Sequence, residues 1–92
     1  MYTIQTPPAF LRTAKKFFKF HPDLKERFHS IIEILHKHPT HSSLKLHSLS
    51  GKLKGLHGIS LTYKYRITLM FKIENKTIIL LDIGNHDEVY SK

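Results

Sequence analysis

The order of apolar and polar residues changes once along the chain, from a helical period to a strand period. In residues 9–20 the apolar positions recur every three or four residues, with basic residues between them, which predicts an amphipathic helix with a basic outer face. Pro22 ends this helix because proline cannot continue the hydrogen-bond ladder. A second helix is expected over about residues 23–37, with Asp23 and Glu26 at the spacing of a capping box.

From residue 44 onward apolar residues tend to alternate with polar ones, which indicates β-strands. The alternation is clearest over Tyr65–Ile73, so one face of that strand is buried and the other carries Arg66. A preceding strand should run through about Tyr63, after a loop that holds His47. Residues 77–83 are almost continuously apolar, which is typical of a central, covered strand.

These elements predict an α+β fold. A short N-terminal strand over residues 2–5 should precede a two-helix hairpin, which packs on a mostly antiparallel sheet of about four strands. The 92 residues suffice for a single domain with one core, so we expect one domain spanning 1–92.

The charge of the chain favours an acidic partner. Fifteen Lys and Arg residues against seven Asp and Glu give a formal charge of +8, which favours nucleic acid over a membrane surface or an acidic protein. The absence of cysteine excludes disulfides and thiolate metal sites and makes a reducing cytoplasm the default. No segment approaches the ~20 apolar residues of a membrane span, so we expect a soluble cytoplasmic domain without a membrane partner.

Several side chains in the second half of the chain suit cleavage of RNA. His47 and His86 can act as acid and base, since histidine exchanges protons near neutral pH. Arg66 can pair with two phosphate oxygens, and Lys52 and Lys54 can hold neighbouring phosphates. These residues predict acid–base attack of the 2′-hydroxyl on phosphorus, without a metal ion or a cofactor.

Tyr90 can stack on a base or join the proton transfer. Each assignment has a structural alternative: Tyr90 can plug the core, His47 can cap its loop, and the lysines can be solvated strand ends. His36, His38 and His41 match no zinc-binding pattern, and we expect no metal site there.

Three motifs, LHSLSGKLKG at 46–55, YRITLMF at 65–71 and LDIGNHDEVY at 81–90, resemble the RelE/ParE superfamily of type II toxins, and most closely its RelE/StbE and YafQ branches. The resemblance implies a RelE-like fold and a ribosome-dependent endoribonuclease, an mRNA interferase. Such a toxin enters the ribosomal A site, cuts the mRNA there and is silenced by a cognate antitoxin.

The resemblance also implies roles for individual residues. Arg66 corresponds to a phosphate-binding arginine and Tyr90 to a functional tyrosine near the C-terminus. His47 and His86 correspond to histidines of YafQ-like members. Basic side chains beside them are expected to bind RNA phosphates, namely Lys52, Lys54 and Lys64.

The chain departs from the YafQ-like pattern at three places. Ser60 and Lys64 stand near the positions of a further histidine and an acidic residue, and His57 replaces a tryptophan found in many relatives. His57 is therefore either a spare base or a packing residue. The alternative functions are a ParE-like inhibitor of DNA gyrase and a catalytically inactive homologue that still binds its antitoxin.

Overall fold

A five-stranded sheet and three α-helices make up the computed structural model, which describes residues 1–90. The α+β class and the predicted arrangement, a short N-terminal strand and a helical hairpin with a mostly antiparallel sheet, are confirmed, with one strand more than the expected four. The elements follow in the order β1 (Thr3–Gln5), α1 (Pro8–Phe20), α2 (Lys25–Lys37), β2 (His47–Ser48), β3 (His57–Ser60), β4 (Tyr65–Lys72), β5 (Thr77–Asn85) and α3 (His86–Tyr90).

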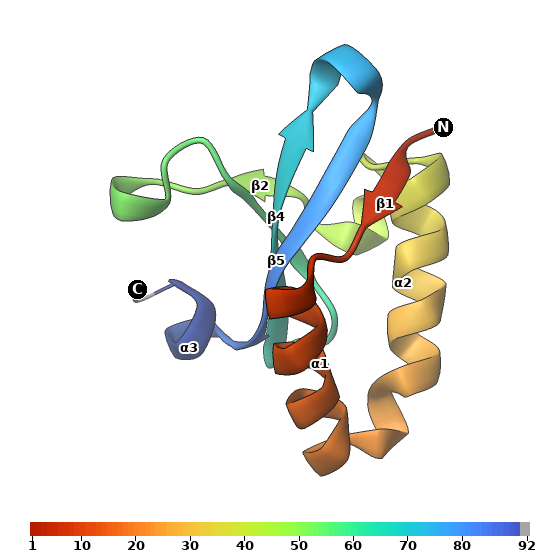
Figure 1. Ribbon diagram of the computed structural model, residues 1–92, viewed down its shortest axis with the longest axis vertical. Coiled ribbons are helices and arrows are strands. Elements are labelled where there is room, and N and C mark those ends of the chain that lie inside the picture. Colours follow the sequence, from red (N-terminus) through yellow and green to blue (C-terminus); the bar gives the residue numbers. More distant parts are fainter. Residues whose placement is uncertain (91–92) are drawn as a thin grey trace.

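The strands lie in the order β1-β5-β4-β3-β2 (Figure 1). Strand β1 is parallel to β5, and the other neighbours are antiparallel. β5 is therefore central over its first half, as its apolar sequence predicts. The hairpin of α1 and α2 lies on one side of the sheet, whereas α3 lies apart from it near the long loop between β2 and β3 (Figure 1).

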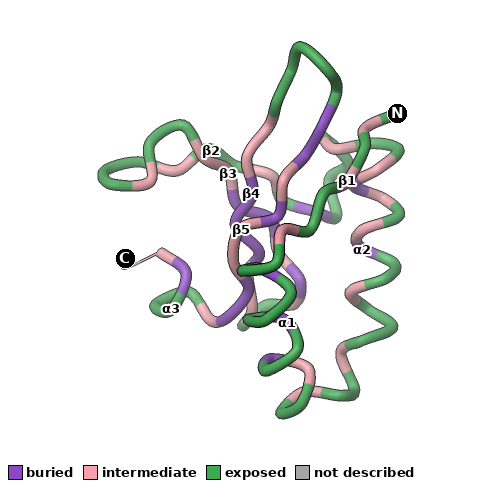
Figure 2. Tube along the Cα trace, in the orientation of Figure 1, coloured by how far each residue is buried: buried purple, intermediate pink, exposed green. Residues whose placement is uncertain are grey.

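The core fills the space between the helical hairpin and the sheet. Figure 2 shows the buried residues gathered along the strands. Alternate residues of the strands, Ile59, Ile67, Leu69 and Leu80, are fully buried and meet the inner residues of the helices. The helices contribute Phe10, Ala14, Phe17, Ile31 and Leu35. The face of β4 that carries Arg66 is the face turned away from this core, as the alternation predicts.

A β-bulge in β5 changes which residues face the core. Thr68 pairs with Asp82 and Leu69 with Leu80, so Leu81 is one residue in excess. After the bulge the core position falls on Ile83 rather than on Asp82. This shift could not be predicted from alternation, because the segment is almost continuously apolar.

Four local expectations were wrong. His47 lies in strand β2 rather than in a loop, and β3 ends at Ser60 rather than near Tyr63. Ile73 is 76% exposed, since β4 ends at Lys72. Helix α2 begins at Lys25 without a side-chain cap, so the expected capping box at Asp23 does not form.

The longest helices of residues 1–90 have 13 residues each, and none of the described helices is long and apolar enough to cross a membrane.

The core predicts a clear contrast between two leucines of the hairpin. Leu35 is fully buried, so Leu35→Ala should lower the free energy of unfolding by about 2–5 kcal/mol, through lost burial and the cavity left behind. Leu11 is 52% exposed, so Leu11→Ala is the matched control and should cost less than about 1 kcal/mol. Urea unfolding measures both values, and equal losses would contradict the assignment of the core.

Candidate functional site

The open face of the sheet carries two rows of paired residues. In the first row His47 of β2 pairs with Gly58 of β3, and Gly58 pairs with Thr68 of β4. In the second row Ser60 pairs with Arg66. Because paired residues point to the same face, His47 and Arg66 lie on the same side of the sheet.

The hydrogen bond from His47 to the backbone fixes its tautomer. The Nδ1 atom lies 2.8 Å from the carbonyl oxygen of Lys45, which can only accept, so Nδ1 carries the proton. In the neutral ring Nε2 then holds a lone pair. Lys45 adopts a left-handed conformation with φ of 52°, which is unusual for a residue with a side chain. This turn aims the Lys45 carbonyl at the imidazole.

Tyr90 faces His47 from helix α3. The Tyr90 hydroxyl lies 3.4 Å from His47 Nε2, and the two rings meet edge to face at 6.0 Å. The phenol is the donor in this pair because Nε2 of the neutral ring has no proton. Burial raises the pKa of Tyr90 above its ordinary value, and the positive charge of Arg66 opposes part of the rise. Tyr90 is therefore uncharged and able to donate at neutral pH.

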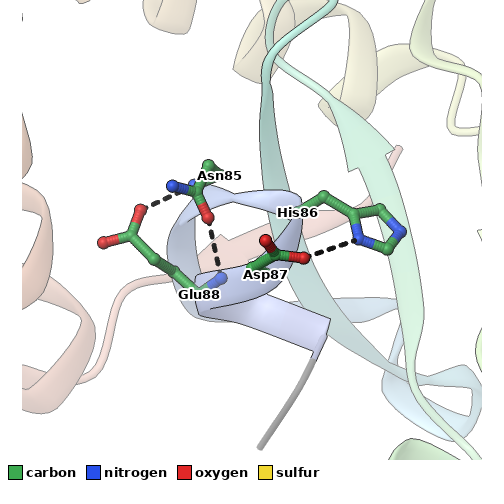
Figure 3. A network of polar contacts seen from close by, with 4 residues as sticks. All are labelled: Asn85, His86, Asp87 and Glu88. Carbon is green, nitrogen blue, oxygen red and sulfur yellow. Dashed lines mark hydrogen bonds and ion pairs between the residues drawn. The ribbon is translucent and has the colours of Figure 1, made fainter.

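His86 also packs against Tyr90. The two rings are 4.6 Å apart in an edge-to-face arrangement. His86 Nδ1 is 3.8 Å from a carboxylate oxygen of Asp87, and both side chains are exposed, so this contact adds little stability (Figure 3).

Helix α3 begins with a reciprocal capping box, which holds Tyr90 in place. The Glu88 amide donates to the Asn85 side-chain oxygen at 2.8 Å, and the Asn85 amide donates to a Glu88 carboxylate oxygen at 2.9 Å (Figure 3). Two amides of the helix start are thereby satisfied. This cap connects the end of β5 rigidly to the helix that carries Tyr90.

Arg66 is held by the turn between β3 and β4. Its Nη1 atom donates to the carbonyl oxygens of Thr62, Tyr63 and Tyr65 at 2.7, 2.8 and 3.2 Å. These bonds come from Nη1 alone. The guanidinium is thus oriented before any ligand arrives, and it is close enough to lower the pKa of Tyr90.

A pocket of about 320 Å³ opens where the loop after β2 meets α3. Its lining includes His47, His86 and Tyr90, together with the loop residues Ser48, Leu49, Ser50 and Leu53. A larger hollow of about 580 Å³ lies between α1, β5 and α3, but none of the predicted catalytic residues lines it. We therefore take the smaller pocket as the candidate site.

The three predicted RNA-binding lysines are not part of the pocket lining. Lys52 and Lys54 lie in the exposed turn that begins at Gly51, next to the lining residue Leu53. The Lys64 ammonium lies 5.6 Å from the centre of the Tyr65 ring, in the same turn that holds Arg66.

His57 lies on the helix-covered face of the sheet, away from His47. Its ring packs edge to face on Phe71 at 5.1 Å, which corresponds to the packing alternative. Its buried Nδ1 has no hydrogen-bond partner among residues 1–90. The residue that sequence reasoning missed is Gly58, which stands between His47 and Thr68 and whose only sequence signal is a glycine inside a strand.

The histidines near the end of α2 have other contacts. His36 Nδ1 is hydrogen-bonded to the Tyr2 carbonyl, and His41 Nδ1 to the Ser43 hydroxyl. In the described part of the chain, no group of three or more His, Cys, Asp or Glu side chains is placed to hold a metal ion.

Solved structures that share this fold include bacterial toxins. A metal-bound toxin from Helicobacter pylori has a TM-score of 0.80 and 26% identity, over 98% of this chain and 100% of that one. YafQ in the DinJ–YafQ toxin–antitoxin complex of E. coli has a TM-score of 0.77 and 16% identity, over 97% of both chains. A YoeB/ParE toxin from Agrobacterium tumefaciens has a TM-score of 0.76 and 12% identity, over 91% of this chain and 98% of that one.

No protein-family model matches the chain, and no curated protein does. At these identities the structural likeness establishes the fold. The resemblance to RelE/ParE-type toxins, indicated by three sequence motifs, is therefore confirmed at the level of the fold, over 91–98% of the chain.

The electrostatics of the site predict how Tyr90 responds to loss of a charge. Arg66→Gln removes the cation that opposes the effect of burial, so the Tyr90 pKa should rise further. Burial already makes the folded chain hold the phenol proton more tightly than the unfolded chain, and the substitution widens this difference. The contribution of Tyr90 to stability is therefore constant below the unfolded-state pKa of about 10 and is lost as the pH rises from there through the raised pKa of the folded chain.

Ultraviolet titration of tyrosinate measures this pKa, with Tyr90→Phe subtracted to isolate the Tyr90 contribution. Lys72→Gln is the control, because Lys72 is an exposed cation at the far end of the same strand. An unchanged Tyr90 pKa in Arg66→Gln would show that the arginine does not act on the phenol.

Proposed function

We propose that this chain is the toxin of a type II toxin–antitoxin system and acts as an endoribonuclease on mRNA at the ribosome. The observation that carries the proposal is the pairing of His47 Nε2 with the Tyr90 hydroxyl in the candidate pocket. This pair supplies a proton acceptor and a proton donor. Arg66 is outside the pocket lining, but its charge acts on the Tyr90 phenol, and it supplies the phosphate-binding cation. Dependence on the ribosome rests on the resemblance to YafQ-like toxins.

His47 is the general base in this proposal. Its Nε2 lone pair takes the proton of a ribose 2′-hydroxyl, and the freed oxygen attacks the adjacent phosphorus. The bond between the 2′-oxygen and phosphorus forms as the bond to the 5′-oxygen breaks, which leaves a 2′,3′-cyclic phosphate. The Lys45 carbonyl stabilises the imidazolium that results, since it accepts from Nδ1 in both protonation states.

Tyr90 is the general acid. The leaving 5′-oxygen needs a proton, and the phenol holds one throughout the neutral range because burial raises its pKa. The proton that Tyr90 shares with His47 in the free protein passes to the leaving oxygen once substrate separates the two groups. His86 stands against the same ring and is the second candidate for this step.

Arg66 stabilises the pentacoordinate phosphorane. Three backbone carbonyls hold its Nη1, so the charge is placed before the reaction begins and little reorganisation is needed. The scheme moves protons with side chains and does not call for a metal ion. Lys52, Lys54 and Lys64 lie on the turns that flank the site and bind neighbouring phosphates of the RNA.

A cognate antitoxin is the proposed protein partner. The YafQ structure compared above comes from a toxin–antitoxin complex with DinJ. The formal charge of +8 favours an acidic partner that covers the basic surface.

Cleavage should depend on the site residues and not on exposed histidines elsewhere. In a cell-free translation reaction, primer extension should detect discrete cuts that require ribosomes. His47→Ala and Tyr90→Phe should each slow cleavage by about 10²–10⁴-fold because each removes a proton-transfer group. Arg66→Ala should slow it by about 10²–10³-fold, the usual effect of losing one transition-state contact. His38→Ala, an exposed histidine remote from the pocket, should retain full activity.

A chelator selective for zinc and copper leaves ribosomal Mg²⁺ in place and should not slow the cuts. Absence of cuts by the wild type would contradict the proposal. In that case inhibition of gyrase supercoiling would identify a ParE-like protein, and binding of an antitoxin alone would identify an inactive homologue.

A further inference from the structure

Gly58 lies directly beneath the contact between His47 and Tyr90. It occupies the middle of β3, paired with His47 on one side and with Thr68 on the other. A glycine inside a strand weakens the strand, because it gives no side chain to the packing and costs backbone entropy. Such a glycine often marks a place where another group approaches the backbone closely.

The group that approaches Gly58 is the phenol of Tyr90. A Cβ atom placed on Gly58 would lie far closer to the Tyr90 hydroxyl oxygen than the sum of their van der Waals radii. It would also lie 3.1 Å from Tyr90 Cζ and 3.2 Å from His47 Cε1. Every other residue type carries a Cβ, so only glycine lets both rings keep their present positions.

The conformation of the backbone does not explain this glycine. Gly51 and Gly55 have positive φ angles of 64° and 94°, which other residues rarely adopt, and a Cβ on either would meet no atom within 4 Å. Gly58 is the reverse case, because it lies in a regular strand without a positive φ. Its requirement is therefore one of space above the sheet.

We propose that Gly58 is a positioning residue, whose missing side chain seats the Tyr90 hydroxyl against His47 Nε2. The catalytic consequence of this inference rests on the proposed ribonuclease function. The position of the Tyr90 hydroxyl against His47 Nε2 does not depend on any activity. Lys45 orients His47 from one side, the Asn85–Glu88 cap orients Tyr90 from the other, and Gly58 sets the distance between them.

The test is a double-mutant cycle with Gly58→Ala, Tyr90→Phe and the double variant. Phenylalanine at position 90 lacks the oxygen that the new methyl group would strike. Gly58→Ala should therefore destabilise the wild type more than it destabilises the Tyr90→Phe protein, as urea unfolding would measure. An equal loss of stability in both backgrounds would mean that the strand itself requires glycine, and the proposal would fail.

Nitrogen NMR shifts of the His47 ring report the contact without any RNA. Tyr90→Phe should move the Nε2 signal, because it removes the phenol that donates to this atom. Gly58→Ala should move the signal in the same direction, and adding Tyr90→Phe should then move it no further. If Gly58→Ala leaves the signal in place, the glycine does not seat the pair.

Cleavage kinetics test the catalytic consequence of the Gly58 substitution. Gly58→Ala should lower kcat by about 10²-fold, as expected for displaced catalytic groups, while KM stays within about twofold. The double variant should be no slower than Tyr90→Phe alone, because the two changes remove the same contact. If the double variant instead loses kcat by the product of the two single effects, the proposal is overturned. If the wild type cleaves no RNA, the proposed function fails, and the stability and NMR measurements still decide the role of Gly58.

Discussion

The antiparallel pairing of β4 with β5 is the constraint on which the rest of the molecule depends. It joins eight residue pairs and gives the sheet one apolar face and one polar face. The helical hairpin covers the apolar face, since that is where burial removes the largest apolar surface from water. The predicted catalytic groups are left on the other face, where the short helix α3, the loop after β2 and the turn between β3 and β4 contact them.

The strongly periodic segments could be read from the sequence. Alternation in β4 placed Arg66 on the open face correctly. The predicted apolar stripe of α1 comprised Phe10, Leu11, Ala14, Phe17 and Phe18; it includes the three buried residues of the helix, Phe10, Ala14 and Phe17, but its Leu11 is exposed. Strand β2 could not be found this way, because two residues are too few to show a period. His47 becomes part of a strand only through its pairing with Gly58, a contact that no local pattern encodes.

Helix capping also depends on context that the local sequence does not contain. Asp23 and Glu26 have the spacing of a capping box and do not form one, because the chain makes a 3-10 turn over Pro22–Leu24 before α2 begins. Asn85 and Glu88 have the same spacing and do form one. The motif alone does not decide between them. The difference is that Asn85 ends a strand whose register is already fixed by β4, so the helix start is held in position.

The extra residue at Leu81 has a consequence for how this chain tolerates changes in length. Leu80 and Asp82 pair with the adjacent residues Leu69 and Thr68, so removing Leu81 would close the bulge and leave Asp82, Ile83 and all later residues on their present faces. Because strand alternation has a period of two, removal of a second residue from β5 would exchange the faces of every residue that follows it, and the segment carrying α3 and Tyr90 would leave from the helix-covered side of the sheet. Strand β5 can thus lose one residue at this point without separating the two halves of the site, and length variation in the exposed turn after β4 also leaves the register intact.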